Sequence, residues 1–250
     1  MNDKKITDIL DEMNRLFGEY PSTELNYETP FQCLIAVMMS AQTTDVQVNK
    51  VTDHLFKVIT WPEDIVKMWE KELGKAIRTI GLWKGKTKNI YATAKLLVEK
   101  GSKKPSPPAP LPMWEGGSPL VYESSEEVVK YRWYYIPDTI DEMVTLPGVG
   151  IKTAKVVLYV LYGQRWVAVD THVHRVMNRL DVVHTKTPEQ TSKQLEKIIP
   201  DEYKDIAHRT IIYFGRYLCK ARKPECERCP LTKLCGRYKV NWKLKVEGWK

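Results

Sequence analysis

The 250-residue sequence lacks the features of a membrane or exported protein. No apolar run approaches the roughly 20 residues that a membrane-spanning helix needs. The first residues, MNDKKITDILDEMNRLF, are charged and amphipathic from the start, as in a folded helix and unlike a cleavable signal peptide. We therefore expect a globular cytoplasmic protein with no membrane partner.

Strand patterns are also scarce, because alternating apolar and polar runs bounded by hairpin turns hardly occur. Helix start signals are frequent instead. Thr29-Pro30-Phe31-Gln32 predicts a capping box before an apolar helix that runs to about Ala41. Thr44-Asp45-Val46-Gln47 predicts a second capping box, which leaves Gln42 in the turn between two helices. The predicted fold class is all-α.

Further helix boundaries follow from the same signals. Gly81 is expected to be a helix C-cap, followed by a turn at Leu82 and another helix over about 86–100. Thr139-Ile140-Asp141-Glu142 is expected to cap a short helix.

One segment departs from this helical plan. Residues 103–121 hold six of the fifteen prolines and cannot be helical throughout. An aromatic-rich stretch follows them. We interpret 103–135 as an insertion, and a tolerated surface insertion is favoured over a protein-interaction loop.

The positive charge is concentrated at one end of the chain. Residues 216–250 contain eleven Lys or Arg and three Glu, so this segment alone accounts for the formal net charge of +8. Such a basic segment is typical of a protein that binds a polyanion, most often nucleic acid. A solvated basic tail would have the same composition, and charge alone does not distinguish the two.

Four of the five cysteines are clustered as Cys219-x6-Cys226-x2-Cys229-x5-Cys235. Without a signal peptide, four close thiols favour a metal site over disulfides. Zinc and a [4Fe–4S] cluster both accept four thiolates. The long first gap and the single CxxC knuckle favour the cluster, with a structural role in fixing a basic loop. Cys33 lies in an apolar helix and is expected to be a core residue.

The stretch LPGVGIKTAKVV, residues 146–157, combines a tight loop with an immediate helix start. Gly148 and Gly150 lack the Cβ atoms that would block a close approach to the backbone. The unpaired N–H groups at the start of the next helix can hold a phosphate. The motif alone is weak evidence, since a helix end followed by a new helix start explains it equally well.

Two ionisable residues near this loop are candidates for catalysis. Lys152 lies in the first turn of the helix, where the dipole disfavours a cation and so favours the neutral, nucleophilic amine. Positions 152, 155, 159 and 162 share one face of this helix, opposite an apolar face at 154, 157, 158 and 161. Asp170 follows an apolar run at a helix start, where an N-cap role alone would explain it.

These motifs closely resemble the helix-hairpin-helix DNA glycosylases of the endonuclease III type. The resemblance rests on LPGVGIKTAKVV, VAVDTHVHRVMNRL, FQCLIAVMMSAQTTDVQVNK, IRTIGLWKGKTKNI and the four-cysteine pattern. It implies a six-helix barrel domain with the helix-hairpin-helix over 23–164. It also implies a [4Fe–4S] cluster domain made of an N-terminal helix, 1–22, and the segment 165–250. The active site would lie in the cleft between the two.

The resemblance also implies roles for particular residues. The catalytic lysine and aspartate of the family fall on Lys152 and Asp170, and its duplex-probing residues fall on Gln42 and Leu82. The cluster ligands fall on Cys219, Cys226, Cys229 and Cys235. We assign further DNA contacts to the hairpin and to the helix behind Asp170, at Gly148, Val149, Gly150, Thr153 and His172.

The implied function is base excision repair of double-stranded DNA. A monomer would remove oxidised or damaged pyrimidines and cleave at abasic sites by β-elimination through a lysine Schiff base. In a prokaryote the enzyme would be associated with the nucleoid.

Two alternatives remain at this stage. A monofunctional adenine-mismatch glycosylase would carry a glutamate where this chain has SAQTTD and would lack Lys152. A non-catalytic DNA-binding module would not need both Lys152 and Asp170.

Overall fold

The computed structural model describes residues 3–21, 23–101 and 136–239. Within these ranges every regular element is helical and no strand occurs, so the all-α prediction is confirmed. No helix among them has the length and apolar character needed to cross a membrane. The predicted insertion, 103–135, lies outside the described residues. The chain divides into two compact units, Met1–Thr23 with Gln164–Lys250, and Glu24–Gly163.

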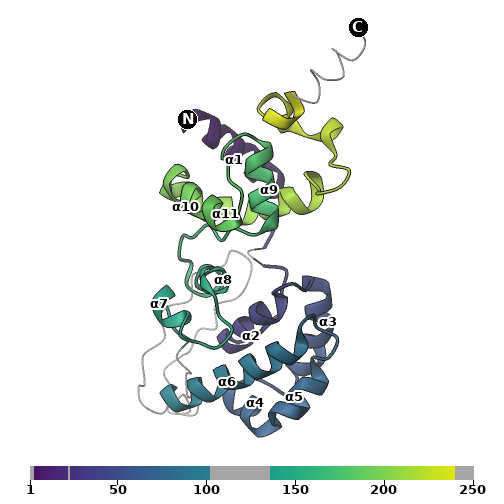
Figure 1. The fold of residues 1–250 in the computed structure, drawn as a ribbon, viewed down its shortest axis with the longest axis vertical. Helices are drawn as coiled ribbons and strands as arrows, with labels where there is room; N and C mark the ends of the chain where they lie inside the picture. Colours follow the sequence, from purple (N-terminus) through teal and green to yellow (C-terminus); the bar gives the residue numbers. More distant parts are fainter. Residues whose placement is uncertain (1–2, 22, 102–135, 240–250) are drawn as a thin grey trace. The chain divides into compact units, whose positions relative to one another are not determined.

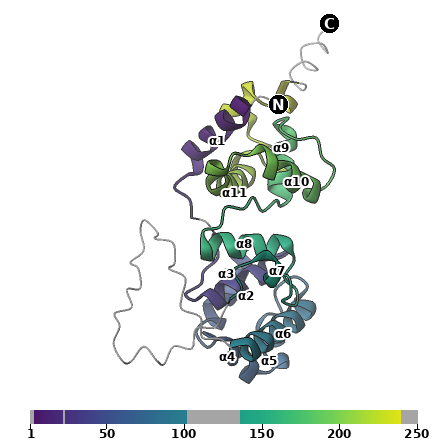
Figure 2. The ribbon, with the colours of Figure 1, turned by 90° about the vertical axis from the view of Figure 1, so that its left-hand side faces the viewer.

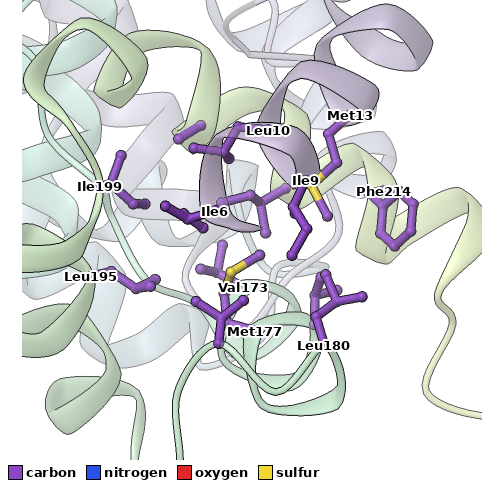
Figure 3. Packing of buried hydrophobic residues seen from close by; sticks show 14 of the residues in the cluster. Ile6, Ile9, Leu10, Met13, Val173, Met177, Leu180, Leu195, Ile199 and Phe214 are labelled. Carbon is purple, nitrogen blue, oxygen red and sulfur yellow. The ribbon is translucent and has the colours of Figure 1, made fainter. Parts of the chain in front are cut away.

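The first unit joins the two ends of the chain through one apolar core (Figures 1 and 3). Its α-helices are α1 (Asp3–Phe17), α9 (Thr171–Arg179), α10 (Pro188–Ile198) and α11 (Lys204–Tyr213). Helix α1 packs against α11 (Figure 2) and buries Ile6, Ile9, Leu10 and Met13, which recur at helical spacing on one face. Each fully buried side chain of this size contributes about 1.5–3 kcal/mol. This burial holds the N-terminal helix to the C-terminal segment.

A π-helix connects this core to the clustered cysteines. Helix α11 continues into η3 (Phe214–Leu218), which ends at Cys219. Phe214 is buried in the core, and Gly215 packs closely against α9. Three 3₁₀ turns complete the unit, η2 (Asp201–Tyr203), η4 (Cys226–Arg228) and η5 (Pro230–Lys233). Single-turn π-helices are frequent at functional sites.

The second unit is built around α2 (Pro30–Ser40), in which residues 31–39 are all buried. The predicted capping box is present, because the Gln32 amide donates to Thr29 Oγ1 at 3.2 Å and the Thr29 amide donates to Gln32 Oε1 at 3.2 Å. The Gln32 side chain also donates to the Ile59 carbonyl at 2.8 Å. This buried amide therefore fixes both the start of α2 and the segment beside it.

The other helices of this unit surround α2. They are α3 (Asp45–Leu55), α4 (Pro62–Met68), α5 (Glu70–Ala76), α6 (Trp83–Gly101), α7 (Ile140–Met143) and α8 (Ile151–Tyr162). Helix α6 lies against α4 and α5, and α8 lies against α2 and α7 (Figures 1 and 2). The predicted cap at Thr139 is confirmed, since its hydroxyl accepts from the Glu142 amide at 3.3 Å.

Two local predictions are wrong in part. Thr44 does cap α3, but the Gln47 side chain donates to Thr79 Oγ1 at 3.1 Å instead of closing a capping box. Gly81 is not a C-cap, because α5 ends at Ala76 and α6 begins at Trp83. A Cβ at Gly81 would lie 3.0 Å from the Gln42 carbonyl oxygen, so packing between two turns, and not helix termination, favours glycine there.

Candidate functional site

The loop between α7 and α8 requires glycine at position 148. Gly148 has a φ of +78°, and a Cβ on it would lie 2.6 Å from Nδ2 of Asn89 on α6. Thr93, one turn further along α6, donates to the Pro147 carbonyl at 3.0 Å. The Val149 side chain is buried and its amide bonds the Leu146 carbonyl at 3.0 Å. Helix α6 therefore fixes the conformation of the loop.

Gly150 has no such structural requirement. Its φ of −91° is open to any residue, and a Cβ there would meet nothing within 4 Å. It is the N-cap of the 12-residue helix α8 and makes no side-chain cap, so the first N–H groups of the helix are not capped by the residue before them. Thr153 lies half-buried in the same turn. Such a helix start is suited to a phosphate.

Lys152 is exposed in this first turn. Lys155 and Tyr159, which share a face of the helix with Lys152, are only 8% and 5% exposed. Helix α8 is covered by both α2 and α7, which leaves less of its surface open than the sequence pattern indicated. Of the two lysines on this helix, Lys152 is the exposed one.

Asp170 is the N-cap of α9, as the sequence indicated. Its Oδ1 accepts hydrogen bonds from the amides of His172 and Val173, each at 2.8 Å. Because both bonds use Oδ1, the cap fixes the carboxylate while Oδ2 takes no part in it. The catalytic role of Asp170 stays a prediction.

His172 is held beside the π-helix. Its Nδ1 lies 3.2 Å from Nη2 of Arg175, and a Cβ at Gly215 would lie 2.9 Å from its Cβ. Burial lowers the pKa of His172, partly offset by Asp170, and so favours the neutral ring. A neutral imidazole can form hydrogen bonds with a ligand but adds no positive charge.

The two turns predicted to probe the duplex share an unusual backbone. Gln42 and Leu82 have φ values of +55° and +58°, in the left-handed region that disfavours side chains with a Cβ. Both residues are exposed, and the Leu82 side chain remains 65% accessible. Such strained residues cluster at functional sites.

The candidate residues are divided between the two units. Gln42, Leu82, Lys152 and the 146–150 loop belong to the unit Glu24–Gly163. Asp170, His172 and the four clustered cysteines belong to the other unit.

The four clustered cysteines are the candidate ligands of the iron–sulfur cluster. All four are free thiols. Burial raises the pKa of Cys229 to about 11, and the other three thiols add to the effect, so the four lie near one another. Four thiolates are the ligands that a [4Fe–4S] cluster takes, so the residues present fit such a cluster.

Arginines of α9 hold the loop that carries these thiols. Arg179 donates to the carbonyls of Lys220 at 2.7 Å and Ala221 at 3.0 Å, and its Nη1 lies 3.5 Å from Cys219 Sγ. Arg175 donates to the Cys219 carbonyl at 3.2 Å. These bonds fix the first ligand loop to the helix that Asp170 caps.

The basic residues expected on this loop differ in their surroundings. Arg222 and Lys223 are exposed, whereas Arg228 pairs with Glu225 at 2.9 Å. Glu225 also accepts from Lys220 at 2.6 Å. The first two residues are therefore the better placed for an anionic ligand.

Replacing Cys226 with serine is expected to remove the cluster and loosen the segment after Leu218. The wild-type protein should contain about four iron atoms and four sulfides, and the variant far less. We expect duplex affinity to fall more than the rate of the chemical step, measured by iron analysis, binding isotherms and single-turnover kinetics. One zinc and no iron in anaerobically purified wild-type protein would contradict this.

Sequence reasoning missed two residues of α6 that contact the candidate loops, Lys86 beside the Gln42 turn and Asn89 beside Gly148. Together with Leu82 and Thr93 they form a stripe along α6 at spacings of four, three and four. Polar residues on one helix face, starting at a candidate site residue, were the available signal.

Comparison with known proteins defines the class of this one. Residues 35–201 match the HhH-GPD superfamily of base excision DNA repair proteins, and this match covers more than half of the chain. Residues 219–235, which span the four cysteines, match the iron–sulfur binding domain of endonuclease III.

Comparison with individual proteins and solved structures identifies the family within this superfamily. The chain is 39% identical to endonuclease III of Rickettsia felis over 87% of its length and 88% of the relative. It is 36% identical to endonuclease III of Escherichia coli K12, over 94% and 96%. A trapped endonuclease III–DNA covalent intermediate matches with a TM-score of 0.80 and 37% identity, over 97% of this chain and 99% of that one. The chain belongs to the endonuclease III family.

The protein is accordingly a DNA-binding base excision repair glycosylase and abasic-site lyase that carries a [4Fe–4S] cluster. Neither the mismatch-specific glycosylase nor the non-catalytic module is favoured by these similarities.

Proposed function

We propose that this protein removes oxidised or ring-damaged pyrimidines from double-stranded DNA and then cleaves the abasic strand through an imine on Lys152. The observation that carries the proposal is an exposed amine in the first turn of α8, two residues after a glycine that the fold itself does not require. The related protein trapped as a covalent intermediate with DNA supports a covalent mechanism. We further propose that the protein acts as a monomer in the cytoplasm, and in a prokaryote at the nucleoid.

The first step is extrusion of the damaged nucleotide. A base inside a duplex is inaccessible to an amine, and damage lowers the cost of unstacking it. Gln42 and Leu82, both exposed on strained turns, would fill the gap that the nucleotide leaves. The amides at the start of α8, together with Gly148, Val149, Gly150 and Thr153, would hold a backbone phosphate. His172 would add a neutral hydrogen-bonding group.

The second step is chemistry at the sugar. Lys152 Nζ forms a bond to C1′ as the bond from C1′ to the base breaks, and the base leaves with the electron pair and a proton. Ring opening gives an imine, which withdraws electrons from C2′. Loss of a C2′ proton then expels the 3′ phosphate, and water releases the lysine. The free oxygen of Asp170 would stabilise the sugar cation or accept the lysine proton.

The [4Fe–4S] cluster would have a structural role, with Cys219, Cys226, Cys229 and Cys235 as its ligands. Bound to all four thiolates, it would tie the ligand segments together and so fix their loop. Arg222 and Lys223, exposed on this loop, would then be presented to DNA.

An incision assay with three duplexes tests the proposed function. They carry thymine glycol, an abasic site or an A·8-oxoguanine mispair. We expect incision of the first two and no release of adenine from the third. The reverse pattern would support the mismatch-specific alternative, and no base release from any duplex would support a binding module.

Replacing the two loop glycines separately tests the phosphate contact. Gly150→Ala should change the free energy of unfolding by less than about 1 kcal/mol, because its backbone suits alanine although alanine is a poorer N-cap than glycine. It should nevertheless weaken duplex binding about tenfold by blocking close approach. Gly148→Ala should destabilise the fold by roughly 1–3 kcal/mol, since its φ is positive and Asn89 lies against it.

Thermal melting and fluorescence anisotropy distinguish these effects. Unchanged duplex affinity in Gly150→Ala would show that no phosphate approaches this residue.

A further inference from the structure

The two strained turns are packed directly against each other. A Cβ at Gly81 would lie 3.0 Å from the Gln42 carbonyl oxygen and 3.2 Å from Thr43 Oγ1. Gln47 on α3 donates to Thr79, just before Gly81, at 3.1 Å. Direct contacts between the two turns therefore fix the position of Leu82 relative to Gln42. The chain that connects the two residues is not needed for this.

Lys86 is the central link in this arrangement. Its ammonium group donates to the carbonyls of Met39 at 2.7 Å and Ala41 at 2.6 Å, and to the Thr43 hydroxyl at 3.0 Å. These three acceptors surround Gln42 in sequence. The backbone N–H of Lys86 donates to the Leu82 carbonyl at 3.1 Å. One residue thus binds both turns, through its side chain on one and its backbone on the other.

The chemistry of the contact suits lysine in particular. An ammonium group has three N–H donors, and all three find acceptors here. The Met39 carbonyl is among those that the C-terminus of α2 leaves without helical partners, and a cation is favoured at that end of a helix. Burial lowers the pKa of Lys86, and the side chain is only 8% exposed. Lys86 is therefore a buried structural residue that holds the two turns together, which we call the clamp, and not a solvated surface charge.

We propose that Lys86 is a positioning residue that fixes the spacing of Gln42 and Leu82, and thereby sets the rate of base removal without touching DNA. This inference rests on the proposed roles of Gln42 and Leu82 in filling the gap. Loss of the clamp would let the two turns move independently, so that the extruded state of the nucleotide is less well stabilised.

The two chemical steps should then respond differently. Base removal from a duplex requires the damaged nucleotide to be unstacked and the gap to be filled. Cleavage of an abasic site in a single strand requires neither. A defect confined to the spacing of the turns slows the first reaction and spares the second, whereas general unfolding slows both.

The experiment compares Lys86→Met with Lys88→Met, which makes the same substitution at an exposed position of the same helix. Rates are measured under single turnover on a thymine glycol duplex and on single-stranded abasic DNA. A 2-aminopurine opposite the lesion reports unstacking. For Lys86→Met we expect base removal to fall at least about tenfold while single-strand cleavage changes by less than about twofold. The 2-aminopurine signal should fall in parallel with base removal.

A second variant covers the case in which Lys86→Met does not fold. Gly81→Ala keeps the clamp and adds one methyl group between the turns, where the neighbours must shift by a few tenths of an ångström. It should reduce base removal selectively in the same way.

The outcomes are distinct. If both reactions fall equally in folded variants, or if neither falls, the role of Lys86 is overturned while the proposed function stands. Wild-type protein that releases no base overturns the proposed function, and the role of Lys86 with it.

Discussion

Lys152→Ala is expected to abolish both strand cleavage and the borohydride crosslink to DNA. If the Lys152 amine forms an imine with C1′, borohydride reduces that imine and leaves the wild-type protein covalently joined to the strand. Alanine cannot form the bond. Duplex affinity should change by less than about tenfold, because the start of α8 and its amides are retained. Denaturing gel electrophoresis after borohydride treatment measures the crosslink.

Lys152→Arg is the matched control for charge. A guanidinium stays protonated and cannot act as the nucleophile, so this variant should bind DNA as the wild type does and still fail to crosslink. Crosslinking by the arginine variant would point to another lysine. Wild-type protein that frees a base but is never trapped would show that water is the nucleophile and that the role assigned to Lys152 is wrong.

Asp170→Asn is expected to lower the single-turnover rate of base removal by about a hundredfold or more, equivalent to roughly 3 kcal/mol. An amide cannot stabilise a sugar cation or accept a proton as a carboxylate does. Its oxygen can still accept the two amide hydrogen bonds that Oδ1 of Asp170 makes, and asparagine is as good an N-cap as aspartate. Stability and duplex binding should therefore be almost unchanged.

Comparing Asp170→Ala with Asp170→Asn separates the contribution of the helix cap from that of the carboxylate charge. The alanine variant removes both functions, and its free energy of unfolding should fall by about 0.5–2 kcal/mol relative to Asp170→Asn. Should the asparagine variant retain the wild-type rate, Asp170 would be only a helix cap, which is the simpler interpretation that the sequence allowed.

The sequence predicted local structure well wherever one residue acts on its near neighbours. The capping box at Thr29 and Gln32 and the caps at Thr139 and Asp170 depend on atoms two or three positions away, so composition and spacing specify them. The prediction that Gly81 is a helix C-cap was wrong because the cause lies far away in the sequence. The need for glycine at this position comes from Gln42, almost forty residues earlier in the chain, and a C-cap was the nearest local explanation.

In the candidate site, too, features set by near neighbours were predicted and features set by distant residues were not. Lys152 was identified from its place after the loop glycines, but its isolation from Lys155 depends on α2 and α7 covering the rest of α8. Lys86 was missed because its acceptors lie 43 to 47 residues away. Gly148 and Gly150 looked equivalent in the sequence, and only the positive φ of Gly148 and the position of Asn89 show that the fold needs the first glycine and not the second.

If Leu82 fills the gap in the duplex as we propose, its left-handed backbone lowers thermal stability at a position that activity requires. Glycine adopts this conformation at little cost, whereas an exposed leucine is strained and contributes little to the core. A directed-evolution experiment that selects for heat resistance alone would therefore favour glycine at position 82. Such a variant would survive heating but would lack the side chain that we propose fills the gap in the duplex. Any programme to stabilise this enzyme should hold position 82 constant and seek its gains elsewhere.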